Sequence, residues 1–151
     1  MPLTDASKNI MLNTLKEWSR FLAEREKLTL VANEVNLATR MIVQECIAFL
    51  KSHNLDVKCD TPEDMKILGV TVRIDPLVEG NYPVSKVSVV LKCGGSARSI
   101  LINANMSISA GGVVVPYEQF KKGIPTNFVT NAAEFVSDSF LYVARTGGKE
   151  E

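Results

Sequence analysis

The sequence predicts an α+β domain, in which an antiparallel β-meander of about four to five strands packs against two N-terminal helices and one C-terminal helix. Three observations predict this class. Apolar residues recur every three to four positions before residue 54 and again after residue 125, which is helical spacing. Between these regions apolar and polar residues alternate, which is strand spacing. Two alternating stretches are joined by Gly94-Gly95, a pair typical of hairpin turns.

The first 54 residues predict two helices. The first spans residue 4 to about 25, and Thr4 or Asp5 can accept hydrogen bonds from its free amide groups. The stretch "EREKLTL" interrupts the apolar spacing, so whether the helix continues there stays open. A second helix is expected from about Asn33 to Ser52, and its wide apolar stripe predicts a central position. The apolar positions of the two helices are Met11, Leu15, Trp18 and Leu22, then Val35, Ala38, Ile42, Cys46 and Phe49, with Leu37, Met41 and Leu50 beside them.

Residues 55–116 are expected to be mainly β. Alternation over residues 55–59 predicts a short strand. "TPEDMKIL" then predicts a short helix near residues 62–67, because Pro62 suits a first helical turn and Gly69 can end it. Val70 begins an alternating strand that Pro76 is expected to stop.

The hairpin at Gly94-Gly95 has a testable register. A two-residue loop pairs Val87 with Ile102 and Val89 with Ile100, which places four apolar side chains on one face. A four-residue loop keeps the same faces together, whereas a three-residue loop would set valines opposite serines, so the agreement supports the hairpin. The stretch "SILINANMSIS", residues 99–109, is expected to continue as one alternating strand. Its core-facing residues would be Ile100, Ile102, Ala104, Met106 and Ile108.

A second glycine turn, Gly111-Gly112, leads to a short strand that ends at Pro116. The last helix is expected over residues 126–145, and Thr126 or Asn127 can cap it. Its buried stripe would hold Val129, Ala132, Val136, Phe140 and Val143, with Phe128 and Phe135 beside it. Residues 146–151 read as a solvated tail, and residues 1–151 as a single domain.

Composition excludes several classes of protein. The chain has 17 basic and 17 acidic residues, which argues against a strongly electrostatic polyanion binder. Its three cysteines, Cys46, Cys59 and Cys93, include no CxxC pair, so neither a metal site nor a redox dithiol is expected. No cofactor is implied. The sequence shows neither a signal peptide nor an apolar run of ~20 residues, and it predicts a soluble, cytoplasmic protein without a membrane partner.

The second face of the predicted sheet is rich in small polar residues. Ser and Asn cover the backbone poorly, so this face permits close approach by a partner. A plain solvated face, a protein contact and a ligand or nucleic-acid surface all stay open. The residues of this face are Lys86, Ser88, Val90, Lys92, Ser99, Leu101, Asn103, Asn105, Ser107 and Ser109.

Charge is unevenly spread along the β region. Residues 84–125 hold five basic and one acidic residue, whereas residues 55–83 hold three basic and six acidic residues. The basic hairpin could bind a weak anionic ligand, a nucleotide or a nucleic acid, or it could be neutralised by the acidic segment. The candidate binding residues are Lys86, Lys92, Arg98, Ser99, Asn103, Asn105 and Ser107.

No arrangement of residues predicts catalysis. His53, the one histidine, stands at a predicted helix end, where a cation is favoured by the helix dipole. Cys59 follows six residues later without a triad pattern, and Glu63-Asp64 reads as helix N-terminal charge. An enzyme with a dispersed site around His53 or Cys59 is therefore the least favoured reading.

The N-terminal stretch "MPLTDASKNIMLNTL" resembles the opening of several small structural proteins of tailed bacteriophages, which begin with a similar capped helix. The resemblance covers about a tenth of the chain. It implies a viral origin, and hence the host cytoplasm, and it transfers no functional residues.

The favoured function is a non-enzymatic protein-interaction or assembly module, acting as a homo-oligomer or adaptor. It follows from the missing catalytic patterns, from the second sheet face, which no helix is expected to cover, and from large apolar residues on the first helix. These residues, Trp18, Phe21 and Leu22, are the candidate interface. The alternative is an anion-binding module that uses the basic hairpin.

Overall fold

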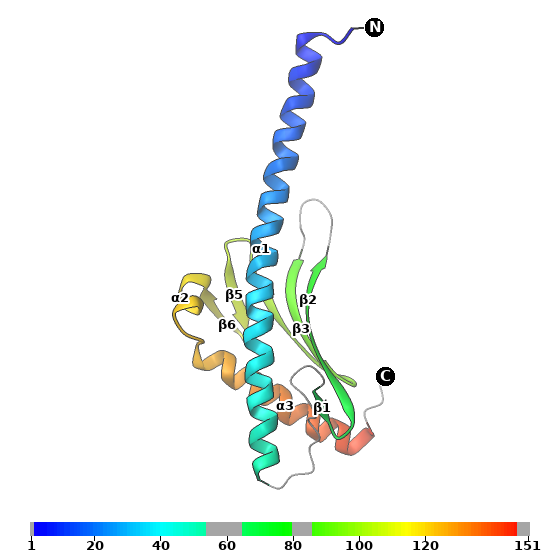
Figure 1. Cartoon of the computed structure of the whole chain (residues 1–151), viewed down its shortest axis with the longest axis vertical. Helices are drawn as coiled ribbons and strands as arrows, with labels where there is room; N and C mark the ends of the chain where they lie inside the picture. The colour runs from blue at the N-terminus through cyan, green and yellow to red at the C-terminus, as the bar shows by residue number, and fades with distance from the viewer. Residues whose placement is uncertain (1, 54–64, 80–85, 148–151) are drawn as a thin grey trace.

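The structure, a computed structural model, describes residues 2–53, 65–79 and 86–147. It is an α+β fold, as the sequence predicts, and its antiparallel sheet has six strands in sequence order (Figure 1). The elements are α1 (Asp5–Ser52), β1 (Lys66–Ile67), β2 (Val70–Glu79), β3 (Lys86–Cys93), β4 (Ser96–Ile102), β5 (Ser107–Ala110), β6 (Val113–Pro116), α2 (Tyr117–Lys122) and α3 (Thr126–Thr146).

A single helix of 48 residues, α1, replaces the two predicted N-terminal helices. The prediction of two helices was wrong because the interrupted apolar spacing at residues 24–30 does not mark the end of a helix. It only moves the apolar residues to another side of the same helix. This stretch contains no Gly or Pro, and Glu, Arg, Lys and Leu are good helix formers. The hydroxyl of Thr29 donates to the carbonyl of Arg25 at 2.7 Å, so it does not disturb the helix. The predicted cap is confirmed, since the Thr4 side chain accepts from the Ser7 amide at 3.1 Å.

The predicted hairpin register is confirmed. Val87 faces Ile102, Val89 faces Ile100, and Cys93 faces Ser96 across the two-residue loop. The expectation of one strand over residues 99–109 was wrong, because β4 ends at Ile102 and the chain turns before β5. Met106 adopts a φ of 64° in this turn.

Two expectations for the preceding segment also change. Lys66 and Ile67 form β1, paired with Thr71 and Val70, instead of the end of a helix. The Met65 carbonyl accepts from the Val72 amide at 2.8 Å, so Met65 is not helical either. Residues 62–64 of that predicted helix and the predicted strand at residues 55–59 lie outside the described residues. β2 continues through Pro76 to Glu79. Since β1 pairs with only the first two residues of β2, Pro76 lies where β2 is an edge strand, and there its missing N–H removes no ladder bond.

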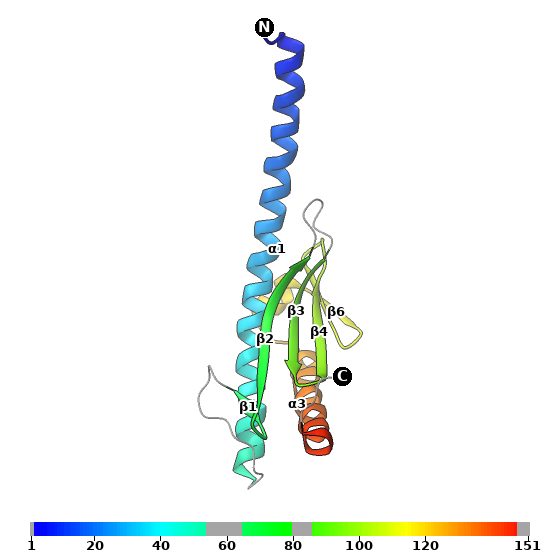
Figure 2. The same cartoon turned by 90° about the vertical axis from the view of Figure 1, so that its right-hand side faces the viewer.

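Both long helices pack on one face of the sheet (Figure 2). The buried side of α1 runs from Val31 to Ile47, with one buried residue every three to four positions. On α3 the buried stripe is centred on Phe128 and Phe135, one position away from the predicted centre, and Val129 is exposed. The core of the sheet is formed by Val72, Ile74, Val87, Val89, Leu91, Cys93, Ile100, Ile102 and Ile108.

The N-terminal part of α1 extends well beyond the sheet (Figure 1). Every residue from Lys8 to Arg20 is exposed, and Phe21 is the first buried residue of the helix. We call residues 5–20 the projecting segment. Its direction is set by the buried half of the same helix.

We predict that Gly112→Ala lowers the free energy of unfolding by about 1 kcal/mol, because Gly112 has a φ of 81° that disfavours a Cβ. Gly123→Ala is the matched control. No atom lies within 4 Å of the added Cβ at either position, and Gly123 has an extended φ of 173°. Urea unfolding of both variants checks the difference, and equal midpoints would contradict a backbone origin.

Candidate functional site

The seven predicted binding residues do not form one site. Lys86, Lys92 and Ser99 lie on the outer face of the sheet, whereas Arg98 faces Leu91 on the inner face. Lys86 and Lys92 are also six residues apart on β3, which corresponds to about 20 Å along a strand. The structure therefore does not bring the three basic residues of the predicted anion site together.

Arg98 connects β4 to α3. Its guanidinium donates to Asn131 Oδ1 at 2.9 Å, to Glu134 at 3.2 Å and to Asp138 at 2.8 Å. Ser139 donates to Ser96 at 3.2 Å beside it. Two carboxylates thus neutralise Arg98, and its donors bind α3 instead of facing solvent.

The other predicted binding residues lie in the turn between β4 and β5. Asn103 donates to Ser107 at 2.8 Å and to Ser109 at 3.0 Å. The Asn105 side chain accepts from the amide of Ser107 at 3.1 Å and from its hydroxyl at 2.6 Å. Such local bonds compete with strand pairing. They explain why the chain turns here, and they occupy the groups that were candidates for a ligand.

Lys86 and Asn103 share one hollow of about 280 Å³ at the end of the sheet near α1. Its other lining residues are apolar, Leu28, Val87, Leu101, Ile102 and Ala104. With a single cation, this hollow is a weak candidate for binding an anion.

The side of α1 that faces away from the sheet carries a row of exposed apolar residues. Their spacings of 4, 7, 8, 7 and 4 residues are each close to one or two helical turns, so they share one side of the helix. These residues are 38–62% exposed, whereas the buried residues on the opposite side of α1 are at most 8% exposed. We call this row the outer stripe: Met11, Leu15, Leu22, Leu30, Leu37 and Met41.

Only part of the predicted interface is accessible. Trp18 is 50% exposed and Leu22 is 38% exposed, but Phe21 is 5% exposed. Phe21 lies on the sheet-facing side of α1, since it precedes Leu28 and Val31 at helical spacing. Its ring contacts that of Trp18 at a centroid distance of 5.2 Å. Phe21 therefore cannot present its side chain to a partner.

The lower half of the outer stripe was missed from the sequence. Leu37 and Met41 were expected beside a centrally buried stripe, yet they are 62% and 57% exposed. The sequence does contain a pattern that indicates this exposed row, because apolar residues occur on both sides of this helix. Such a pattern is shared by a buried helix and by a helix that packs on two different partners.

α2 contacts α1 beside the outer stripe. The phenol of Tyr117 donates to the carboxylate of Glu34, and the Lys121 ammonium lies 4.9 Å from the Tyr117 ring centre. The bond to Glu34, then burial and the negative charges of Glu34 and Glu118, raise the pKa of Tyr117 to about 12. Tyr117 is therefore a neutral donor at physiological pH.

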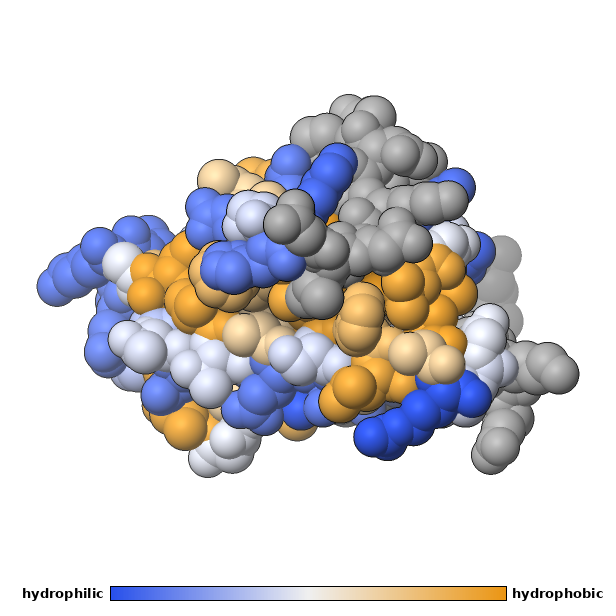
Figure 3. All heavy atoms as spheres, turned by 90° about the horizontal axis from the view of Figure 1, so that it is seen from below, coloured by the Kyte–Doolittle hydropathy of each residue, from blue (hydrophilic) through white to orange (hydrophobic). Residues whose placement is uncertain are grey.

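A groove of about 430 Å³ separates the C-terminal half of α1 from α3. It is lined by apolar residues of both helices, including Phe49 and Val129, and by Glu45. Apolar side chains are exposed at this end of the molecule (Figure 3). Cys46 lines the groove, and burial followed by the charge of Glu45 raises its pKa above the usual thiol range.

The described residues offer little for catalysis. His53 caps α1, with Nδ1 at 3.0 Å from the Phe49 carbonyl and its ring against the Phe49 ring, which agrees with its predicted capping role. Cys59 lies outside the described residues. In the described part of the chain, no three His, Cys, Asp or Glu side chains are grouped as a metal site would need. No described helix is long and apolar enough to cross a membrane.

Comparisons with known proteins add no relative. No protein-family model, no curated protein and no solved structure matches this chain. The function must therefore be argued from the geometry alone.

We predict that Arg98→Ala lowers the free energy of unfolding by about 1 kcal/mol, because it removes two partly exposed ion pairs and the bond to Asn131. Arg73→Ala is the matched control, since Arg73 is exposed on the outer face of β2. Urea unfolding measures both. Equal stability of the two variants would contradict the role of Arg98 in holding α3.

We predict that iodoacetamide at pH 8 leaves Cys93 unmodified in the folded protein. Cys93 is completely buried, its thiol lies 3.8 Å from the Val70 carbonyl, and burial raises its pKa to about 11. The reactive thiolate is therefore scarce. Peptide mass mapping should find Cys46 labelled before Cys93, and Cys93 labelled only after unfolding in guanidinium. Rapid labelling of native Cys93 would show that this part of the core opens.

Proposed function

We propose that the protein is a non-enzymatic assembly module that self-associates through the outer stripe of α1. The observation that carries the proposal is the projecting segment, which is folded as helix, extends beyond the sheet (Figure 1) and exposes large apolar side chains. These are Met11, Leu12, Leu15 and Trp18, between 46% and 58% exposed. Contiguous apolar surface of this kind marks interaction sites in folded proteins.

Helix energetics support a partner for this segment. Helices shorter than ~12–15 residues are marginal in water, and most helix stability in proteins comes from packing. Asn9, Asn13 and Thr14 are moderate helix formers. The Thr4 cap and continuity with the buried half of α1 help to hold the segment in a helix. Packing of its apolar side against another helix would supply the remaining stabilisation.

Charge favours a second copy over an anionic surface. Residues 5–24 hold three basic side chains, Lys8, Lys16 and Arg20, and three acidic ones, Asp5, Glu17 and Glu24. A helix that binds anionic membranes or nucleic acid carries a large basic excess, whereas residues 5–24 have none and the projecting segment itself has an excess of one. The whole chain is also formally neutral, so long-range repulsion does not oppose association of its copies.

The exposed area is sufficient for a dimer. The six residues of the outer stripe expose roughly 600 Å² per chain, and two such stripes approach the ~1,200–2,000 Å² of specific interfaces. The alternative anion-binding function has less support, since Arg98 is engaged by α3. A viral origin agrees with an assembly role and stays a prediction.

We predict that the wild-type chain sediments above its monomer mass of 16.6 kDa and that the triple variant Leu15→Gln, Leu22→Gln, Leu37→Gln sediments as a monomer. Gln keeps helix propensity but removes the apolar contact. Analytical ultracentrifugation over a wide concentration range measures the mass, and circular dichroism verifies that helix content is unchanged.

Two controls separate α1 from other exposed surfaces. Leu77, Leu101 and Val114 form an exposed row on the outer face of the sheet, and changing all three to Thr should leave the assembly intact. Ile10→Gln changes the opposite side of the projecting segment and should also be neutral. A wild-type chain that is monomeric at several hundred micromolar would refute the proposed function.

A further inference from the structure

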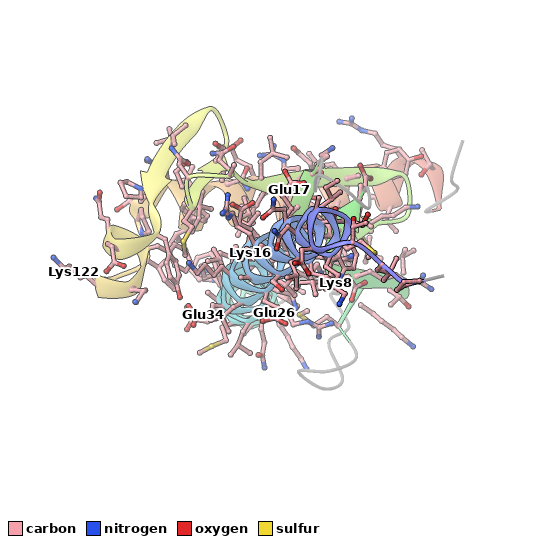
Figure 4. All side chains as sticks on the ribbon, turned by 90° about the horizontal axis from the view of Figure 1, so that it is seen from above. Lys8, Lys16, Glu17, Glu26, Glu34 and Lys122 are labelled. Atoms are coloured by element: carbon pink, nitrogen blue, oxygen red, sulfur yellow. The ribbon has the colours of Figure 1, made fainter. Side chains whose placement is uncertain are left out.

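Four charged residues follow one flank of the outer stripe: Lys16, Lys27, Glu34 and Glu45. Their spacings of 11, 7 and 11 residues are close to whole helical turns, so they share one side of α1. Viewed along the helix, Lys16 and Glu34 lie on the same side of α1, whereas Glu17 points toward the strands (Figure 4). The flank is basic in its N-terminal half and acidic in its C-terminal half.

Contacts within the chain account for Glu34, which accepts from the Tyr117 phenol, but not for the other three residues or for the charge order. All four residues are exposed, and no ion pair joins any of them to another residue in the described part of the chain. Lys16, Glu34 and Glu45 have no opposite charge three or four residues away, where helices place stabilising pairs. The helix dipole does not explain the order either, because its effect is confined to the first and last turns of α1, which hold Asp5 and Lys51.

An antiparallel second copy of α1 accounts for the order. Lys16 with Glu45 and Lys27 with Glu34 both give residue numbers that sum to 61, so one register aligns both pairs. By two-fold symmetry each pair forms twice. A parallel arrangement with a two-fold axis along the helices would place this flank on opposite sides of the pair, so it would bring none of these lysines to these glutamates.

The apolar residues agree with the same register. Leu30 of one copy lies within one residue of Leu30 of the other, at the symmetry axis. Leu22 lies at the height of residue 39 of the second copy, between its Leu37 and Met41, as a side chain inserts between neighbours in packed helices. The apolar side of the projecting segment of one copy thus covers Leu37 and Met41, the C-terminal part of the outer stripe, in the other copy.

We propose that two copies of this chain pair α1 against α1 in antiparallel orientation, with Lys16 of each copy beside Glu45 of the other. The pairing rests on the proposed self-association through α1 and specifies its partner, orientation and register. Each projecting segment then lies along the body of the other copy, and the dimer is closed.

The first test is a charge-reversal cycle on one pair. Lys16→Glu and Glu45→Lys should each raise the dimer Kd about tenfold at low salt, because each turns two attractive contacts per dimer into repulsive ones. The double variant restores both pairs and should return Kd to within about twofold of the wild type. Sedimentation equilibrium measures Kd, and the effects should shrink at high salt.

Glu17→Lys is the matched control, since Glu17 is exposed on another side of the same helix and the net-charge change equals that of Glu45→Lys. It should leave Kd unchanged. If neither single reversal at Lys16 or Glu45 weakens the dimer while the triple Gln variant still dissociates it, α1 assembles in another orientation and this inference falls alone. A wild-type monomer would refute the proposed function itself.

Oxidative cross-linking reads the orientation directly. Leu30→Cys should form a disulfide between position 30 of both copies, which peptide mapping distinguishes from the native cysteines. Leu12→Cys is equally exposed to solvent but should not link to itself, because antiparallel copies separate the two positions by about 55 Å. Efficient 12–12 linkage would establish a parallel pair and overturn the inference.

Discussion

Burial of one side of α1 against the sheet determines the shape of the molecule. Between Val31 and Ile47 the helix presents apolar residues to β2, β3 and β4, and these contacts fix its axis. Because the helix is continuous through residues 24–30, the same axis extends to the projecting segment. The placement of residues 5–20 therefore depends on packing of the C-terminal half of the same helix, most of it between Val31 and Ile47.

The second constraint on α1 is its outer stripe. A helix that packs on one partner can leave its opposite side uniformly polar, and α1 does not. Its stripe is nevertheless interrupted by Ser19, Glu26 and Asn33, which divide the exposed apolar surface into segments. Such interruption lowers non-specific association while it keeps the contacts that a matching helix can use.

The parts of the fold that depend on alternation were predicted well. The parity of Val87, Val89, Ile100 and Ile102 excludes every hairpin register shifted by one residue, since such a shift exposes apolar residues, and the two-residue turn at Gly94-Gly95 selects among the others. Periodicity does not report whether a helix is continuous, so α1 was divided in two. The turn at Asn103 was missed because its cause is hydrogen bonding among Asn103, Asn105 and Ser107, which alternation does not encode.

Periodicity also predicted the candidate interface and the candidate anion site only in part. Trp18 and Leu22 are accessible, as a surface row requires, but Phe21 belongs to the sheet-facing side. Arg98 has the strand parity of Ile100 and Ile102, so its place on the inner face was readable from the sequence. Its partners on α3 were not, because they are more than 30 residues away in the chain. Contacts of that range follow only from the packing of whole elements.

The edges of the sheet limit how copies of this molecule can join. At one edge, β1 covers only two residues of β2, and Pro76 interrupts the donors of the uncovered part. At the other edge, β6 is four residues long and ends in Pro116. Short edges with proline give poor templates for an incoming strand. These edges therefore disfavour polymerisation by strand addition, the usual hazard of an open antiparallel sheet. When many copies are crowded together, contact through the helical surfaces is favoured over pairing of sheet edges.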